Sequence, residues 1–351
     1  MPDFANLPLS FNLLALAVAG AVVWLAGTRL SRYAAAISER SGIGQAVIGM
    51  LLLAAVSSLP EIAITVTSTL DDVAALAINN LLGGAALQVT LLALADALLV
   101  RGALTHVVAK PSALIQGVLL ILMLAMFVAG VVVGDRPLLG VGLWCWAILC
   151  IYLAAIWTIA HARDAWVPGT AATTGGKALD TGDGLPDAPR GESDERLVRL
   201  IVKTVIAAAS ILVAGYALAR TGEAIAEQSG LGASFVGAVV LAFVTSLPEM
   251  STIYGAVKLG RYVMAVSEVF GTAMFNVALV FLVDAVYAGA PVLTEAGAFS
   301  GFAALLLVAL VAVYVVGLLE RRDTVVLRMG LDSLIVLIFY FGGLAVLYRL
   351  R

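Results

Sequence analysis

Long, almost uncharged stretches recur along the 351-residue chain and constrain its fold more than any other feature. Hydrophobic residues make up 62% of the sequence and charged residues only 12%, about half of the share (~25%) found in soluble domains. A chain with so little charge lacks the polar surface of a soluble domain, whereas about 20 apolar residues cross a bilayer as a helix. We therefore predict an all-α integral membrane protein with ten transmembrane helices, at residues 11–26, 45–69, 73–100, 111–133, 138–160, 200–218, 231–257, 263–287, 296–319 and 331–348.

The composition also excludes several other classes of protein. A net charge of −3, without a basic cluster, argues against nucleic-acid binding. Two cysteines, Cys145 and Cys150, are too few for a secreted disulfide scaffold, and their apolar neighbours favour packing over redox roles. No basic residue precedes the first apolar stretch, so we do not expect a cleaved signal peptide.

The positive charges between the predicted helices indicate the orientation. With the N-terminus outside, sixteen of the 20 Lys and Arg residues lie in cytoplasmic loops and four lie outside. Because cytoplasmic loops are enriched in Lys and Arg, we predict that both termini face out and that the longest loop faces the cytoplasm.

That loop separates two groups of five predicted helices. We predict a first five-helix repeat over residues 1–162, a cytoplasmic linker over 163–196 and a second five-helix repeat over 197–351. Gly, Pro, Thr and Asp dominate the linker, which is typical of a solvated, flexible segment. Its aspartates do not have the spacing of an EF-hand calcium loop.

A sequence repeat relates the two groups. Residues of the first group align with residues of the second at one constant offset, which places position 41 opposite position 229. Residues 41–61 and 229–249 are identical at 11 of 21 positions, and both segments end in Ser-Leu-Pro-Glu. At the same offset, without a gap, residues 83–96 align with residues 271–284. Each group has five spans, an odd number, so the second copy must cross the membrane in the opposite direction. Inverted repeats of this kind place a transported substrate near the membrane midplane, which favours a transporter.

The Ser-Leu-Pro-Glu segments place unusual chemistry inside apolar helices. A proline lacks the backbone N–H, so Pro60 frees the carbonyl of Val56 and Pro248 frees that of Val244. An unpaired carbonyl in hydrocarbon costs several kcal/mol, and a bound ion can satisfy it.

A glutamate follows each proline, and both glutamates lie far from the ends of their predicted helices. A charge at the bilayer centre costs about 2.5–3.5 kcal/mol, so Glu61 and Glu249 each need a cation or a proton. Other oxygen-bearing side chains share the faces of these glutamates or stand at matching positions in the next helix: Ser57, Ser58, Thr245, Ser246, Gln88, Asn276 and Thr272.

These groups are hard oxygen donors, with no His or Cys among them. Such ligands select Ca²⁺, Na⁺ or similar cations over zinc or copper. In the alternative interpretation, the glutamates are protonated structural residues and the hydroxyls bond back to their own helices.

The same segments resemble the α-repeats of the cation/Ca²⁺ exchanger superfamily, in its sodium/calcium exchanger-like branch. The resemblance rests on SSLPE at 57–61, LLGGAALQ at 81–88, TSLPE at 245–249 and VFGTAMFN at 269–276. It implies ten helices in two inverted halves, and antiport by alternating access, with flanking hydroxyls that complete sites for Na⁺. It also implies a diamond of four side chains around the central cation sites, which are Glu61, Gln88, Glu249 and Asn276.

The chain departs from the family's pattern within this quartet. Gly84 stands where a serine is usual, Gln88 stands where an asparagine is usual, and Asn276 stands where sodium/calcium exchangers often carry an aspartate. The site therefore offers two negative charges rather than three, which leaves the coupling ion open between Na⁺ and H⁺.

We expect a secondary active antiporter that exchanges Ca²⁺ for Na⁺. The alternatives are an H⁺-coupled or other-cation exchanger of the same fold and a cation-binding membrane sensor that does not transport. An intramembrane serine hydrolase is disfavoured because neither histidine lies near Ser57 or Ser58 to act as a base. The expected partners are inorganic cations and lipid, in a prokaryotic cytoplasmic membrane, with no cofactor.

Three further acids lie outside the quartet. Glu268 stands near the cytoplasmic end of its helix, where it either lines a vestibule or pairs with Arg261. Asp96 and Asp284 stand near helix ends, and we expect both at the membrane interface.

Overall fold

The computed structural model describes residues 7–70, 74–100, 104–108, 110–161, 196–228, 246–320, 325–326 and 329–350. Within these ranges the chain is helical apart from two short β-hairpins. The elements are α1 (Leu9–Ser41), α2 (Gln45–Val47), the π-helix η2 (Ile48–Leu53), α3 (Ala54–Ser57), α4 (Leu59–Leu70), α5 (Ala74–Leu99), α6 (Leu104–Val107), α7 (Pro111–Val133), β1 (Pro137–Leu138), β2 (Val141–Gly142), α8 (Leu143–His161), α9 (Leu197–Gln228), α11 (Leu247–Lys258), α12 (Tyr262–Val286), α13 (Val292–Glu295), α14 (Ala298–Glu320), β3 (Val325–Val326), β4 (Met329–Gly330) and α15 (Leu331–Leu350).

Eight of the described helices are long and apolar enough to cross a membrane: α1, α5, α7, α8, α9, α12, α14 and α15. Apolar segments of this length become helices because a bilayer offers no other partner for backbone N–H and C=O groups. The predicted span at 45–69 is a helix interrupted at Ser58. Of the predicted span at 231–257, the structure describes the part from Ser246 onward.

The constant offset of the sequence repeat extends through nearly all of the described elements. Helices α9, α11, α12, α13 and α15 begin at this offset from α1, α4, α5, α6 and α8, respectively. The hairpin β3–β4 keeps the same offset from β1–β2. The start of α14 differs by one residue from the position that this offset from α7 gives. The repeat that two short sequence blocks predict therefore covers the helices around them as well.

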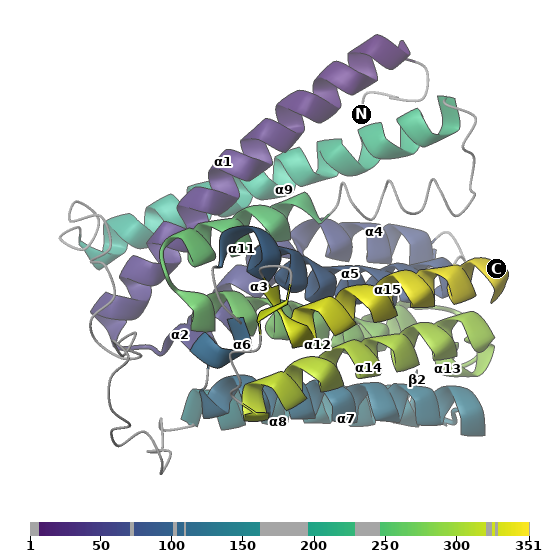
Figure 1. The fold of residues 1–351 in the computed structure, drawn as a ribbon. Coiled ribbons are helices and arrows are strands. Elements are labelled where there is room, and N and C mark those ends of the chain that lie inside the picture. Colours follow the sequence, from purple (N-terminus) through teal and green to yellow (C-terminus); the bar gives the residue numbers. More distant parts are fainter. Residues whose placement is uncertain are drawn as a thin grey trace.

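The first helices of the two copies run in opposite directions. The Nδ2 atom of Asn12, near the start of α1, donates to Gln228 at the end of α9 over 3.3 Å. At the other ends of the same pair, Nζ of Lys203 lies 5.6 Å from the ring centre of Tyr33. Figure 1 shows the two long helices crossing each other beside the bundle of shorter helices. An antiparallel pair of this kind is what an inverted repeat requires.

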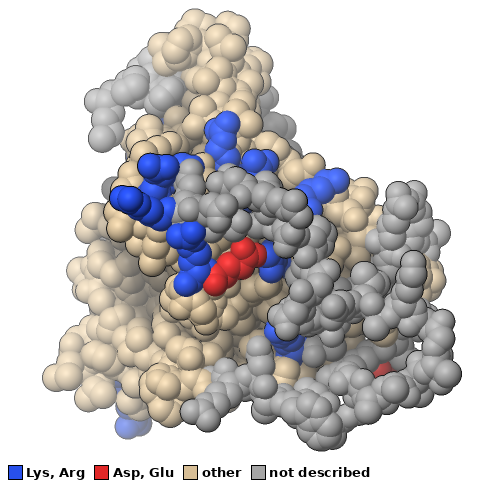
Figure 2. Space-filling model, turned by 90° about the vertical axis from the view of Figure 1, so that its left-hand side faces the viewer, with Lys and Arg blue, Asp and Glu red and all other residues tan. Residues whose placement is uncertain are grey.

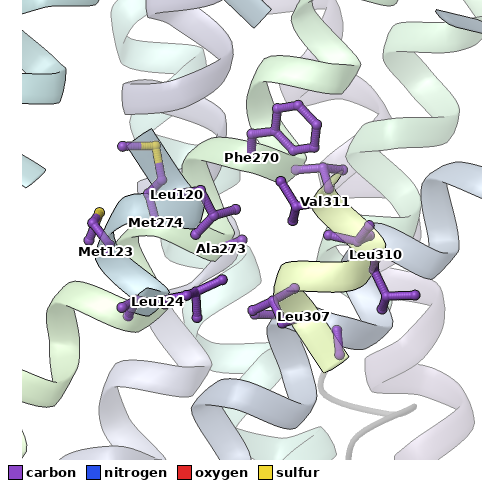
Figure 3. Close-up of a cluster of buried hydrophobic side chains, with 14 of the residues drawn as sticks. Leu120, Met123, Leu124, Phe270, Ala273, Met274, Leu307, Leu310 and Val311 are labelled. Carbon is purple, nitrogen blue, oxygen red and sulfur yellow. The ribbon is translucent and has the colours of Figure 1, made fainter. Parts of the chain in front are cut away.

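Apolar side chains from both copies form the main core. Leu120, Met123 and Leu124 of α7 pack against α12 and α14, and Figure 3 shows them facing Met274 and Leu307. All five side chains are fully or almost fully buried. This core packs α12 of the second copy against α5 and α7 of the first copy.

Two buried aspartates hold the hairpins in place. Asp96 accepts hydrogen bonds from the N–H of Leu104 (2.9 Å), the N–H of Gly330 (2.9 Å) and Oγ of Ser333 (2.7 Å). Its counterpart Asp284 accepts from the N–H of Val292 and of Gly142, which are the repeat counterparts of Leu104 and Gly330. Each aspartate thus ties its own half to the hairpin of the other half. Both side chains are buried, and backbone N–H groups satisfy the carboxylates; their expected position at the membrane interface stays a prediction.

Lys and Arg side chains gather on one end of the molecule, which Figure 2 shows face-on. It is the end at which α1 ends and α9 begins, whereas α1 begins and α15 ends at the opposite end (Figure 1). This separation is the pattern from which the sequence predicts both termini outside.

Candidate functional site

The Ser-Leu-Pro-Glu segments each begin a new helix. Helix α3 ends at Ser57 and α4 begins at Leu59, and Ser58 between them has φ −82° and ψ 3°. Ser246, before α11, has almost the same conformation, with φ −84° and ψ 4°. Proline is well accepted in the first turn of a helix, where its missing N–H has no intrahelical partner in any case. The sequence places the break where the structure has it, and the structure adds that each proline starts a helix.

The two helix starts carry the two glutamates in their first turns. Glu61 is 3% exposed and Glu249 is 1% exposed. A carboxylate in the first turn is stabilised by the positive end of the helix dipole. The carboxyl groups of Glu61 and Glu249 lie close enough to interact directly, although they belong to opposite halves of the chain. Neither oxygen of Glu249, nor Oε2 of Glu61, has a hydrogen-bond partner.

Two amides occupy matching positions on the helices that pack against α4 and α11. Gln88 of α5 and Asn276 of α12 are fully buried, and neither the oxygen nor the nitrogen of either amide has a partner. Helices α4 and α11 each contact both α5 and α12, so the carboxylates and the amides come from four helices packed together.

The hydroxyls divide into two kinds. Ser58 and Thr272 are fully buried, and their hydroxyl oxygens have no partner. Ser57 is equally buried, but its hydroxyl donates to the carbonyl of Ala54 (3.2 Å), which is the back-bonding of the alternative interpretation. Ser246 is buried and Val56 is half-buried. The predicted ligands Thr245 and Val244 lie outside the described residues.

About half of the buried side-chain polar atoms without a hydrogen-bond partner in the described residues thus belong to the predicted ligands. Native proteins leave few buried polar atoms without a partner, and such atoms need an explanation such as an ion. Within the described ranges, no three His, Cys, Asp or Glu side chains converge on one position that could hold a metal ion. The arrangement is instead a pair of carboxylates surrounded by neutral oxygen donors, the ligand chemistry of Ca²⁺ and other hard cations.

Comparison with known proteins assigns the chain to a family. A sequence profile of the sodium/calcium exchanger protein family matches residues 11–160 and 200–349. The chain belongs to this family. The inner membrane protein YrbG of Escherichia coli (strain K12) is 28% identical to it over 252 residues, 71% of each chain.

The fold is that of solved sodium-calcium exchangers. The exchanger NCX_Mj soaked with 10 mM Na⁺ and zero Ca²⁺ matches with a TM-score of 0.71 at 14% identity. The same protein soaked with 10 mM Na⁺ and 10 mM Sr²⁺ matches with a TM-score of 0.72 at 15% identity. Both matches cover 96% of this chain and 99% of that chain. Sodium/calcium exchangers are transporters rather than enzymes, so the family fold implies cation antiport.

Gly84, where the chain departs from the family's pattern, has room for a side chain next to Asn276. A β-carbon built on Gly84 would lie 3.9 Å from Nδ2 of Asn276, an ordinary van der Waals contact. A serine therefore fits at this position, opposite its counterpart Thr272. The position of Gly84 therefore supplies no side-chain oxygen, whereas its repeat counterpart Thr272 does.

Three polar side chains near the quartet were not among the predicted ligands. Thr65, four residues after Glu61, is buried, and its hydroxyl has no partner. Thr252, three residues after Glu249, donates a hydrogen bond to Oε1 of Glu268. Helical spacing from the glutamates identifies both threonines, because residues three and four apart share a face.

Glu268 itself is fully buried. The alternative in which it pairs with Arg261 is wrong, because Arg261 forms an ion pair with Glu39.

Proposed function

We propose that this chain is a secondary active antiporter that exchanges Ca²⁺ for Na⁺ by alternating access. The site near the membrane midplane contains Glu61, Glu249, Gln88 and Asn276, with flanking oxygens from Ser57, Ser58, Thr245, Ser246 and Thr272 and from the carbonyls of Val56 and Val244. The observation that carries the proposal is the concentration of buried, unpartnered oxygens around two adjoining carboxyl groups. Two carboxylates balance the charge of one Ca²⁺.

The proposal includes the topology. Ten helices cross the membrane in two inverted repeats, 1–162 and 197–351, joined by a cytoplasmic linker at 163–196, with both termini outside. The antiparallel α1–α9 pair and the gathering of Lys and Arg on one end support this assignment. A prokaryotic cytoplasmic membrane is the proposed location, in keeping with the inner membrane protein YrbG as a relative.

The test is a flux measurement in proteoliposomes. Purified protein is reconstituted with Na⁺ inside, and uptake of ⁴⁵Ca²⁺ is followed after dilution into Na⁺-free buffer. We expect uptake that depends on the Na⁺ gradient and is lost in Glu61→Gln and in Glu249→Gln. The matched control is Glu295→Gln, the same substitution at an exposed position, which is expected to transport at the wild-type rate.

Two other results would change the proposal. Uptake driven by a pH gradient alone, without Na⁺, assigns H⁺ as the coupling ion. Its basis would be the neutral Gln88 and Asn276, which leave the quartet with two acids. Absence of gradient-driven flux of any divalent cation refutes antiport, and cation binding without flux indicates a sensor.

A further inference from the structure

Glu268 is a third buried carboxylate beside the exchanger site. It is 0% exposed, its Oε1 accepts from the hydroxyl of Thr252, and its Oε2 has no partner. Thr252 is also 0% exposed. Within the described part of the chain, no Lys or Arg forms an ion pair with Glu268, since its nearest candidate, Arg261, pairs with Glu39.

The backbone of Glu268 lies at a close contact between η2 and α12. A β-carbon on Gly49 of η2 would lie 2.5 Å from the carbonyl oxygen of Met264 and 3.1 Å from the backbone nitrogen of Glu268. The backbones of η2 and α12 are therefore in direct contact at this level. On the other side, the hydrogen bond from Thr252 directs the Glu268 carboxylate toward α11.

The position of Glu268 relates it to the site. Thr252 follows Glu249 by three residues on α11, so the two side chains share a face. Glu268 precedes Asn276 by eight residues on α12, which is about 12 Å along the helix axis. Glu268 and Glu249 are close enough to interact electrostatically, although Glu61, Glu249 and Glu268 do not form a group of three side chains that could hold one metal ion. Glu268 thus lies beside the quartet, displaced toward the ends of α11 and α12 that carry Lys258 and Arg261.

A buried carboxylate without a cation is costly, because its desolvation is not repaid by an opposite charge. A protein whose substrates are cations has a direct way to supply that charge. We propose that Glu268 and Thr252 form a second cation position that adjoins the Glu61–Glu249 pair and contributes a third negative charge to the transport pathway. This inference rests on the proposed antiport of cations at that pair. The oxygen-only ligands and single charge suit a monovalent ion, Na⁺.

The second position is present in one half of the molecule only. The repeat counterparts of Thr252 and Glu268 are Ile64 and Asn80, which supply neither a hydroxyl nor a charge. The proposed position therefore has no counterpart on the opposite side of the quartet. It also restores the third charge that Asn276 removes from the quartet.

The experiment is equilibrium binding of ²²Na⁺ and ⁴⁵Ca²⁺ to purified, detergent-solubilised full-length protein. The variants are Glu268→Gln, Thr252→Val and Glu249→Gln, with Glu295→Gln as the matched control. In Glu268→Gln we expect the number of bound Na⁺ per protein to fall by one, while one Ca²⁺ still binds. In Thr252→Val we expect the same number of bound Na⁺ per protein as in the wild type. At least one of these ions should bind about threefold more weakly.

The outcomes separate this inference from the proposed function. Wild-type Na⁺ binding in Glu268→Gln, together with loss of Ca²⁺ binding in Glu249→Gln, overturns the second position and keeps the antiporter. Absence of both Na⁺ and Ca²⁺ binding in the wild type overturns both. Glu268→Asn, which installs the residue found in the other half, replaces Glu268→Gln if that variant elutes as an aggregate. If neither variant folds, unchanged Na⁺ binding in Thr252→Val overturns the inference.

Discussion

Neutralising one carboxylate of the central pair should weaken binding of Ca²⁺ far more than binding of Na⁺. The perturbation is Glu249→Gln, which keeps the shape of the side chain and one of its oxygens but removes its charge. Both glutamates are buried and adjoin each other, so a cation between them feels both charges with little screening by salt.

The expected magnitude follows from Coulomb's law. At about 4 Å and an effective dielectric constant of about 20, two unit charges attract by about 4 kcal/mol. Loss of one carboxylate therefore removes up to about 4 kcal/mol for Na⁺ and about 8 kcal/mol for Ca²⁺. With about 1.4 kcal/mol per tenfold change in affinity, these are upper limits of about three and about six decades. The retained amide oxygen reduces both losses, but the loss for Ca²⁺, on a logarithmic scale, stays about twice that for Na⁺.

The assay is equilibrium binding of each ion to the purified variant and to Glu295→Gln as the control. Because the substitution is conservative, the elution profile and the thermal unfolding temperature of both variants should match those of the wild type. Equal losses for the two ions, or a Ca²⁺ affinity within about threefold of the wild type, would refute the assignment of Glu249 as a charged ligand.

Three further predictions test other parts of the molecule. Asp96→Ala leaves three buried donors without an acceptor and should lower the free energy of unfolding by roughly 3–5 kcal/mol. The measurement is the unfolding temperature in detergent, which should fall, while the Ca²⁺ affinity of the folded fraction should not change. Gly84→Ser, which places a hydroxyl beside the quartet, should raise Na⁺ affinity about threefold, whereas Gly83→Ser, which meets nothing within 4 Å, should not. In a cysteine-free background, Leu139→Cys in the first hairpin should react with an impermeant maleimide on intact cells, and Val325→Cys in the second only after permeabilisation; the reverse pattern would invert the proposed topology.

The sequence predicts an all-helical fold with an internal repeat because the two copies keep the same side chains at a constant offset. Ser-Leu-Pro-Glu at a fixed offset identifies the helix break at Ser58 and the helix start at Leu247, and the structure has Ser58 and Ser246 in almost the same conformation. The scarcity of charge makes Glu61 and Glu249 conspicuous, and both prove to be buried. Features that recur in both halves can therefore be read from one chain.

The aspartate contacts could not be predicted in the same way. Asp96 binds the N–H of Gly330, which belongs to the other half of the chain. A backbone N–H is present at every residue except proline, so it leaves no mark in the sequence that pairs it with a particular carboxylate. Near a helix end an acid is most simply interpreted as interfacial, and its contact with the hairpin of the other half becomes visible only in the structure.

The partner of Glu268 could not be predicted from the sequence because Glu268 does not follow the repeat: its counterpart in the first half is Asn80. Its own half offered Arg261 as a nearby partner, yet that arginine extends to Glu39 of the other half. The residue that does contact Glu268, Thr252, stands where the first half has Ile64, so comparison of the halves gives it no support. Positions that obey the repeat determine where the helices lie, because both copies must build the same half-site. Positions at which the two copies carry different residues make the two halves of the proposed site different. In an antiporter, such a difference changes how ions enter and leave. We therefore expect the residues that distinguish this exchanger from its relatives to lie among the unpaired positions, with Gly84 and Glu268 first among them.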